Sequence, residues 1–213
     1  MGRTNGGIPP EDCARMMRSK GLRPAAIGRA RTRMTTIRPG LPADSRAIAS
    51  VHVDTWRLAY SGILGGDYLA GLSKRDWTKS WHTRLTTPGS AEFVLVAEAE
   101  RRMVGFVAGG PDRESDPRYE GEIYAIYVLR RMQFRGMGRA LFLAAVDSFL
   151  LRGMRSLLVW VLAANPYRRF YESLGGELVQ NRSIRVGGRR LEEVGYGWAD
   201  IKPLAPPFVL PLP

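Results

Sequence analysis

A strand, a loop with two closely spaced glycines and an apolar helix follow one another between residues 122 and 151. The run EIYAIYV, residues 122–128, is rich in β-branched and aromatic residues, which predicts a strand. QFRGMG, Gln133 to Gly138, forms the loop, and the apolar pattern from Gly138 to Leu151 predicts a helix that Gly153 ends. Backbone N–H groups at a helix start attract phosphate oxygens, and glycines let a ligand approach closely. The order therefore predicts a site for a phosphate-bearing ligand.

Two common nucleotide-binding motifs do not match this loop. The dinucleotide fingerprint G-x-G-x-x-G needs a third glycine where the chain has Leu141. A P-loop needs Gly-Lys followed by Ser or Thr, and the loop lacks that sequence. Binding of a nicotinamide, a flavin or ATP by these motifs is therefore disfavoured.

The flanking segments predict one mixed α/β domain. Before the loop we expect a short strand after Met34, helices from Asp44 to Tyr60 and from Lys74 to Arg84, a loop SGILGGDYLAGL between them, and a hairpin of EFVLVAE and MVGFVAG. After it we expect an apolar strand SLLVWVLA, a helix capped by Asn165 and Pro166, and a last hairpin that turns at Gly187 and Gly188. The strand, helix, strand order around the glycine loop predicts two parallel neighbouring strands.

Four segments of the chain, in this order, resemble the GNAT (GCN5-related) N-acetyltransferases. QFRGMG resembles the family's Q/R-x-x-G-x-G/A loop, EIYAIYV the strand before it, and the run from Gly138 the helix after it. Asn165 with RRFYESLGG resembles the closing N…FYxxLGF motif, with Gly176 in place of the usual aromatic residue. The resemblance covers Thr35 to Ile201 and implies the GNAT fold, an α/β fold with a mostly antiparallel sheet, a central splayed parallel pair and about four flanking helices.

The resemblance implies that acetyl-CoA is the co-substrate. The pyrophosphate would lie on the amides of Arg135 to Arg139, and the pantetheine arm along Ile126 to Val128. Asn165 matches an asparagine near the pantetheine, although its spacing to Tyr171 is one residue shorter than in many members. The expected cofactor-binding residues are Ile126, Tyr127, Val128, Gln133, Phe134, Arg135, Gly136, Met137, Gly138, Arg139 and Asn165.

The resemblance also implies two catalytic residues. Glu122 occupies the position of the glutamate in the histone-acetylating branch, which implies a base that deprotonates the acceptor amine, with a water relay as the alternative. Tyr171 matches the tyrosine that protonates the departing CoA thiolate. The oxyanion of the tetrahedral intermediate would be met by the backbone N–H of Val128.

Other chemistry-bearing residues have simpler interpretations. His52 and His82 have no partner at metal-ligand spacing, and Cys13 has no neighbouring base, so we predict neither a metal site nor a cysteine nucleophile. The lone cysteine also excludes an internal disulfide, which favours a cytoplasmic protein.

Aromatic and basic residues carry two further alternatives. One alternative is an acceptor-pocket wall formed with Tyr60 by Trp56, Trp77 and Trp81, but aromatic residues at helical spacing favour the core. The other is recognition of an acidic acceptor by the arginines of the last hairpin, for which a solvated basic face is favoured. These arginines are Arg182, Arg185, Arg189 and Arg190.

The net charge of +12 raises the question of a nucleic-acid partner. About half of the excess lies in residues 1–33, which contain few large apolar residues and are predicted to be a disordered extension, with the GNAT domain at 34–213. Met34 as the native start, or a transit peptide, are hypotheses for this extension. It lacks aromatic residues between its basic ones, which disfavours a nucleic-acid binder.

The predicted function is transfer of acetyl from acetyl-CoA to a primary amine by direct attack on the thioester. The acceptor stays open between a small amine, an amino acid, an antibiotic and a protein N-terminus, and the oligomeric state stays open, with a homodimer as one alternative. The alternative function is a non-catalytic acyl-CoA sensor. No apolar stretch approaches the roughly 20 residues that a bilayer crossing needs, so we expect no membrane partner.

Overall fold

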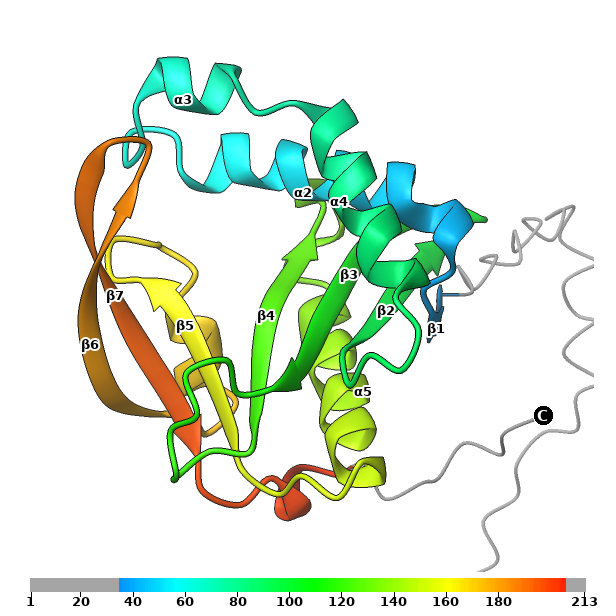
Figure 1. Ribbon diagram of the computed structural model, residues 1–213, viewed down its shortest axis with the longest axis vertical. Helices are drawn as coiled ribbons and strands as arrows, with labels where there is room; N and C mark the ends of the chain where they lie inside the picture. Colours follow the sequence, from blue (N-terminus) through cyan, green and yellow to red (C-terminus); the bar gives the residue numbers. More distant parts are fainter. Residues whose placement is uncertain (1–34, 206–213) are drawn as a thin grey trace, which may run out of the picture. The chain divides into compact units, whose positions relative to one another are not determined.

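A seven-stranded sheet forms the centre of the computed structural model, which describes residues 35–205 (Figure 1). The strands are β1 (Thr35–Pro39), β2 (Phe93–Ala99), β3 (Arg102–Pro111), β4 (Gly121–Val128), β5 (Leu157–Leu162), β6 (Glu177–Val186) and β7 (Arg189–Trp198). Their order is β1-β2-β3-β4-β5-β7-β6, and only β4 and β5 are parallel. The predicted mixed sheet with one central parallel pair is confirmed.

Helices cover both faces of this sheet (Figure 1). The described α-helices are α2 (Ser45–Ala59), α3 (Gly66–Ala70), α4 (Lys74–Thr86), α5 (Met137–Leu151) and α6 (Arg169–Glu172). Because side chains alternate along a strand, Phe106 of β3 packs with the buried residues of α2 and α4, whereas Val107 packs with those of α5. The sheet therefore separates two apolar layers.

Two local predictions were wrong. The segment SGILGGDYLAGL, expected to be a loop, contains the short helix α3. The helix expected from Asn165 onward begins only at Arg169, because the Oδ1 atom of Asn165 accepts a hydrogen bond from the N–H of Tyr167 at 2.9 Å. This bond, to the residue two positions later, forms an Asx turn where a helix cap was expected.

Glycines with positive φ border both ends of α5. Gly136 precedes the helix with φ of 79°, and Gly153 follows it with φ of 80°. The N–H of Gly153 donates to the carbonyl of Leu150 and that of Met154 to the carbonyl of Phe149, both at 3.0 Å. These two bonds form a Schellman motif, which confirms Gly153 as the helix stop.

An extra residue in β4 makes β4 and β5 diverge. Ala108 of β3 pairs with Ala125, but its neighbour Gly109 pairs with Ile123, so Tyr124 is inserted as a bulge. The parallel pairing of β4 with β5 covers only Gly121 to Ile123, so the two strands are not paired beyond this point. The bulge therefore coincides with the start of the splay.

Trp198 explains why Gly176 stands where the family motif has an aromatic residue. A Cβ atom on Gly176 would lie 2.6 Å from the Trp198 ring, and the Nε1 atom of Trp198 donates to the Leu174 carbonyl at 3.0 Å. The indole of β7 therefore fills the space that an aromatic side chain at position 176 would occupy.

The predicted extension of residues 1–33 lies outside the described residues, so the division at Met34 stays a prediction. Within residues 35–205 every helix is too short or too polar to cross a membrane.

Candidate functional site

A cavity of about 460 Å³ lies where β4 and β5 diverge. Its walls come from both strands, the end of α2, the loop before α5 and the region around α6. Of the predicted cofactor-binding residues, all line it except Arg135, which is exposed, and Met137, whose side chain is buried in the core. The predicted catalytic Tyr171 lines the cavity, whereas Glu122 does not.

The backbone of β4 offers hydrogen-bond donors to this cavity. The N–H of Leu129 donates to the Val104 carbonyl at 2.8 Å, so Leu129 occupies a hydrogen-bonded position opposite β3. Hydrogen-bonded and non-hydrogen-bonded positions alternate along an antiparallel pair. The amides of Val128 and Ile126 therefore point away from β3, toward the side that β5 has left.

The glycine loop places the start of α5 beside these amides. The side chain of Gln133 donates to the Val128 carbonyl at 2.9 Å, which fixes the loop against the end of β4. Gly136 and Gly138 both line the cavity, and a Cβ atom on Gly138 would lie 3.3 Å from Phe170. The first N–H groups of a helix have no intrahelical partner and carry a partial positive charge. This end of the cavity therefore suits an anionic group.

Tyr171 and Tyr60 bring two phenol groups to the cavity. Tyr171 is 9% exposed, and its ring stacks on that of Tyr196 at 5.7 Å. Burial, and next the neighbouring Tyr60, raise the pKa of Tyr171, so its hydroxyl keeps its proton at neutral pH. Tyr60, the residue that ends α2, accepts a hydrogen bond from the Nδ2 atom of Asn165 at 3.5 Å.

Glu122 is held by an arginine that the sequence did not link to it. The Nε atom of Arg113 lies 2.9 Å from Oε2 of Glu122, its Nη2 atom bonds to Oε1, and its backbone N–H donates to Oε2 at 3.2 Å. The glutamate is 1% exposed. Arg113 lies in the polar loop between β3 and β4, where no periodic pattern could predict its partner.

The tryptophans of α2 and α4 belong to apolar clusters and do not line the cavity, which confirms the core interpretation. Trp56 donates from Nε1 to the Tyr127 hydroxyl at 2.8 Å, and Trp81 donates from Nε1 to Nδ1 of His52 at 3.3 Å. Burial lowers the pKa of His52 to about 3, and Arg84 adds to this effect. Of the four aromatic residues considered for a pocket wall, only Tyr60 lines the cavity.

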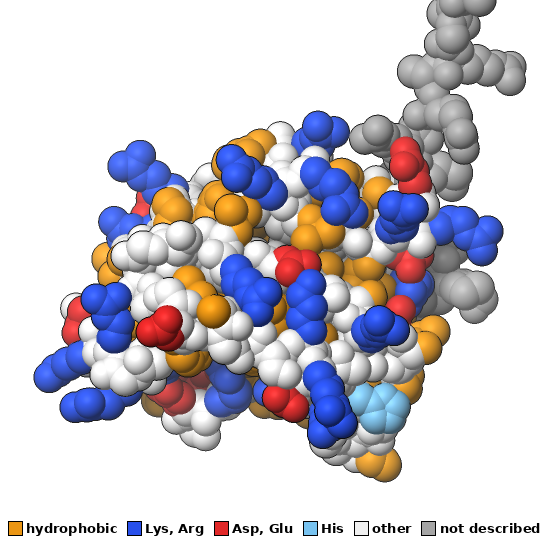
Figure 2. All heavy atoms as spheres, turned by 90° about the horizontal axis from the view of Figure 1, so that it is seen from above, with side chains coloured by type: hydrophobic (Ala, Val, Ile, Leu, Met, Phe, Trp, Pro, Cys, Tyr) orange, Lys and Arg blue, Asp and Glu red, His pale blue; other side chains and the backbone are white. Residues whose placement is uncertain are grey.

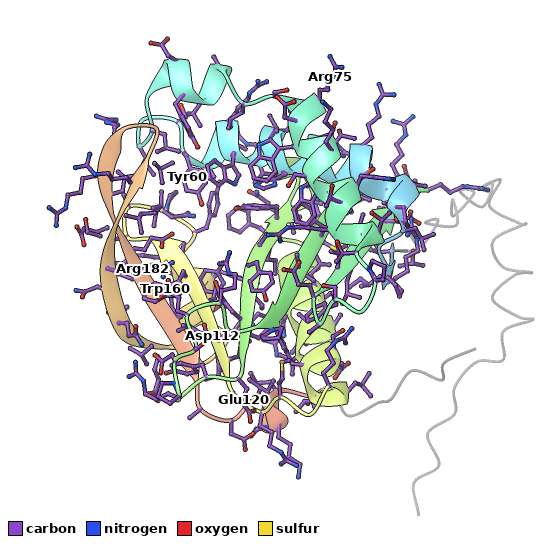
Figure 3. The ribbon with its side chains drawn as sticks, viewed as in Figure 1. Tyr60, Arg75, Asp112, Glu120, Trp160 and Arg182 are labelled. Atoms are coloured by element: carbon purple, nitrogen blue, oxygen red, sulfur yellow. The ribbon has the colours of Figure 1, made fainter. Side chains whose placement is uncertain are left out.

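Arg182 departs from the solvated face predicted for the last hairpin. Its guanidinium lies 3.9 Å from the centre of the Trp160 ring, which lines the cavity (Figure 3). It also pairs with Glu193, at 2.9 Å, and with Glu114. Arg185, Arg189 and Arg190 are exposed as predicted.

Basic side chains are spread over the face shown in Figure 2, between apolar and acidic ones. Residues 35–205 contain no group of three or more His, Cys, Asp or Glu side chains that could hold a metal ion. Thr55 and Tyr60 are cavity residues that the predicted site did not include. The helical spacing of Thr55 predicted only that it faces inward, and Tyr60 was considered only as part of an acceptor-pocket wall.

Comparisons with known proteins agree with this geometry. The model of the acetyltransferase (GNAT) family matches residues 59–175. The uncharacterized N-acetyltransferase YuaI of Bacillus subtilis (strain 168) is 39% identical over 172 residues, which are 80% of this chain and 96% of YuaI.

Two solved structures share the fold. One is the PaiA N-acetyltransferase of Thermoplasma acidophilum in complex with coenzyme A, at 18% identity and a TM-score of 0.59, over 75% of this chain and 98% of that one. The other is yncA of Salmonella typhimurium with its cofactor acetyl-CoA, at 22% identity and a TM-score of 0.60, over 83% of this chain and 99% of that one. The chain belongs to the GNAT acetyltransferase family.

Proposed function

We propose that this protein transfers an acetyl group from acetyl-CoA to a primary amine by direct attack on the thioester. The observation that carries the proposal is the cavity at the splay of β4 and β5, which has strand amides along one wall and the start of α5 at one end. Strand amides beside a helix start suit one extended ligand with an anionic group. The coenzyme A and acetyl-CoA complexes of the two structural relatives support the same ligand for this chain.

In this proposal the pyrophosphate of acetyl-CoA lies on the amides of residues 135–139, where the helix start favours negative charge. Arg139 lines the cavity and adds a positive side chain. The pantetheine arm extends along β4, and its amide groups bond to the inward-facing backbone of Ile126 and Val128. Asn165 lines the same cavity and would border the arm.

The reaction needs a neutral amine, because a lysine-like amine has a pKa of about 10.4 and is protonated at neutral pH. Glu122 stays the proposed base, and from its position outside the cavity it would take the proton through water. The amine nitrogen then bonds to the thioester carbon, and the Val128 N–H stabilises the oxyanion. Collapse breaks the carbon–sulfur bond, and the Tyr171 hydroxyl protonates the thiolate. The amine nitrogen loses its second proton to water, and Tyr171 regains a proton from water.

The Arg113–Glu122 pair keeps a second function open, that of an acyl-CoA sensor. A carboxylate bonded to three arginine donors has little freedom to act as a base. A sensor would bind acetyl-CoA at the same cavity and release no thiol.

Calorimetric titration with acetyl-CoA, followed by a free-thiol assay over a panel of amines, tests the proposal. The panel should contain polyamines, amino acids, aminoglycosides and peptides with free N-termini. We expect binding and thiol release that depends on an acceptor. Binding without thiol release for every amine would favour the sensor, and absence of binding would refute the cofactor assignment.

A further inference from the structure

Tyr60 lines the cavity at the end of α2. It is 7% exposed (Figure 3). Asn165, Tyr127 and Tyr171 line the same cavity. These four residues come from three parts of the chain, since Asn165 and Tyr171 are only six residues apart, and the Tyr60 hydroxyl has both Asn165 and Tyr127 as neighbours. The contacts of this hydroxyl determine what it can offer a ligand.

The first contact makes Tyr60 an acceptor. The Oδ1 atom of Asn165 is already bonded to the N–H of Tyr167, at 2.9 Å, so the amide of Asn165 presents its Nδ2 atom to Tyr60. A side-chain NH₂ group can only donate. One lone pair of the Tyr60 oxygen is therefore directed at Asn165.

The second neighbour, Tyr127, has a proton of its own to donate to Tyr60. The indole N–H of Trp56 donates to the Tyr127 oxygen at 2.8 Å, which leaves the proton of Tyr127 for its other neighbour, Tyr60. Burial raises the pKa of Tyr60, and the hydrogen bonds from Asn165 and Tyr127 oppose that rise. Such bonds stabilise negative charge on the Tyr60 oxygen and so make its O–H a stronger donor.

A phenol oxygen has two lone pairs and one proton. Since both lone pairs of Tyr60 face donors, its proton is the part left for a ligand in the cavity. An O–H group that donates to an attacking amine would block the nitrogen lone pair that must form the new bond. The ligand atom that gains from this donor is an oxygen on which negative charge develops.

This inference rests on the proposed function. We propose that the Tyr60 hydroxyl donates a hydrogen bond to the carbonyl oxygen of the bound acetyl group and so completes an oxyanion hole with the Val128 N–H. When the amine attacks, the carbon–oxygen double bond opens and its electron pair moves to that oxygen. Tyr60 keeps its proton throughout, and the thiolate takes its proton from Tyr171. Tyr60 is therefore a third catalytic residue that touches a reacting atom.

Infrared spectroscopy of bound acetyl-CoA carrying a ¹³C-labelled thioester carbonyl tests this directly and needs no acceptor. A hydrogen bond to the carbonyl lowers its stretching frequency. We expect the band to lie lower in the wild type than in the Tyr60→Phe variant. Tyr119→Phe is the matched control, because Tyr119 is also buried but lies outside the cavity, and its band should equal that of the wild type.

The Tyr60→Phe variant should bind acetyl-CoA within about twofold of the wild type and lose about 10²-fold or more in kcat, as loss of an oxyanion donor does. If circular dichroism finds Tyr60→Phe unfolded, Tyr127→Phe replaces it; that variant removes one donor to Tyr60 and should move the band part of the way. Equal carbonyl bands in the wild type and the folded variant would overturn the inference. Absence of acetyl-CoA binding by the wild type would instead overturn the proposed function, and the inference with it.

Discussion

The Nε atom of Arg113 lies 2.9 Å from Oε2 of Glu122, whose side chain is 1% exposed. The proposed base is thus a buried carboxylate in an ion pair, beside the bulge at Tyr124. Arg113 also packs its guanidinium 4.4 Å from the centre of the Tyr124 ring. A base in this setting can exchange protons with the cavity only by way of water.

The Glu122→Gln substitution tests that role through the pH dependence of acetylation. We expect the rate to fall by about 10²-fold at neutral pH and to recover toward the pKa of the acceptor amine, because a neutral amine needs no base. Initial rates measured from neutral to alkaline pH would reveal this. Glu177→Gln, on an exposed residue at the start of β6, is the control. A rate profile identical to that of the wild type would assign the Arg113–Glu122 pair to folding alone.

Gly136→Glu should weaken acetyl-CoA binding by about tenfold or more, because it places negative charge at the positive end of α5. The matched control is Gly153→Glu at the other end of that helix. Both glycines have φ near 80° and open space around the missing Cβ atom, so both variants carry a similar backbone strain of about 1–2 kcal/mol. Calorimetric titration compares them. Equal affinities of the two variants would contradict the phosphate site.

Tyr171→Phe should lower kcat by about 10- to 100-fold and leave acetyl-CoA affinity within about twofold, because the lost proton acts only on the leaving thiolate. Burial raises the pKa of Tyr171 above its ordinary value of 10.0, so the acid form persists throughout the mildly alkaline range. The wild-type rate should therefore not decline below about pH 10 through loss of this proton. Thiol-release kinetics check both statements. Wild-type turnover by the variant would reassign Tyr171 to packing.

His52 should make the fold sensitive to acid. Its pKa is lowered from 6.5 to about 3 in the folded protein, so the unfolded chain binds a proton over this range that the folded chain does not. Stability is therefore fully present above pH 6.5 and decreases as the pH falls toward 3. The loss amounts to about 2 kcal/mol between about pH 6.5 and about pH 5.

Urea unfolding at these two pH values compares the wild type with His52→Leu, which should lose less stability on acidification. His82→Leu, at an exposed histidine of α4, should behave as the wild type does. Equal acid dependence of the wild type and His52→Leu would exclude His52 as the cause.

The sequence predicted the elements that follow a simple periodic rule. The hairpin of β6 and β7 turns at two glycines with positive φ, and Gly153 ends α5, because both are local backbone requirements. The bulge at Tyr124 was not predicted, since the run EIYAIYV has no residue that distinguishes a bulge from a regular strand. The short helix α3 was missed because its glycine-rich segment resembles a loop.

The sequence predicted only those parts of the candidate site that lie in contiguous motifs. Residues on the strand and the glycine loop follow from a contiguous motif, and most of them line one cavity. Arg113 and Tyr60 reach their positions through tertiary contacts with residues 9 and 105 positions away. The spacing of residues along the chain does not predict such contacts.

The bulge at Tyr124 gives the sheet an internal edge. Along this part of β4 the backbone donors face a cavity, although β3 and β5 lie on either side. An exposed edge strand at the outside of a sheet can pair with other polypeptides, which promotes aggregation. Here residues of β5, α2 and α6 line the cavity along this internal edge. A slender chain with amide groups of its own could pair with the free donors of β4, and a pantetheine arm has this form. The splay thus leaves room for a ligand in the place of a missing strand.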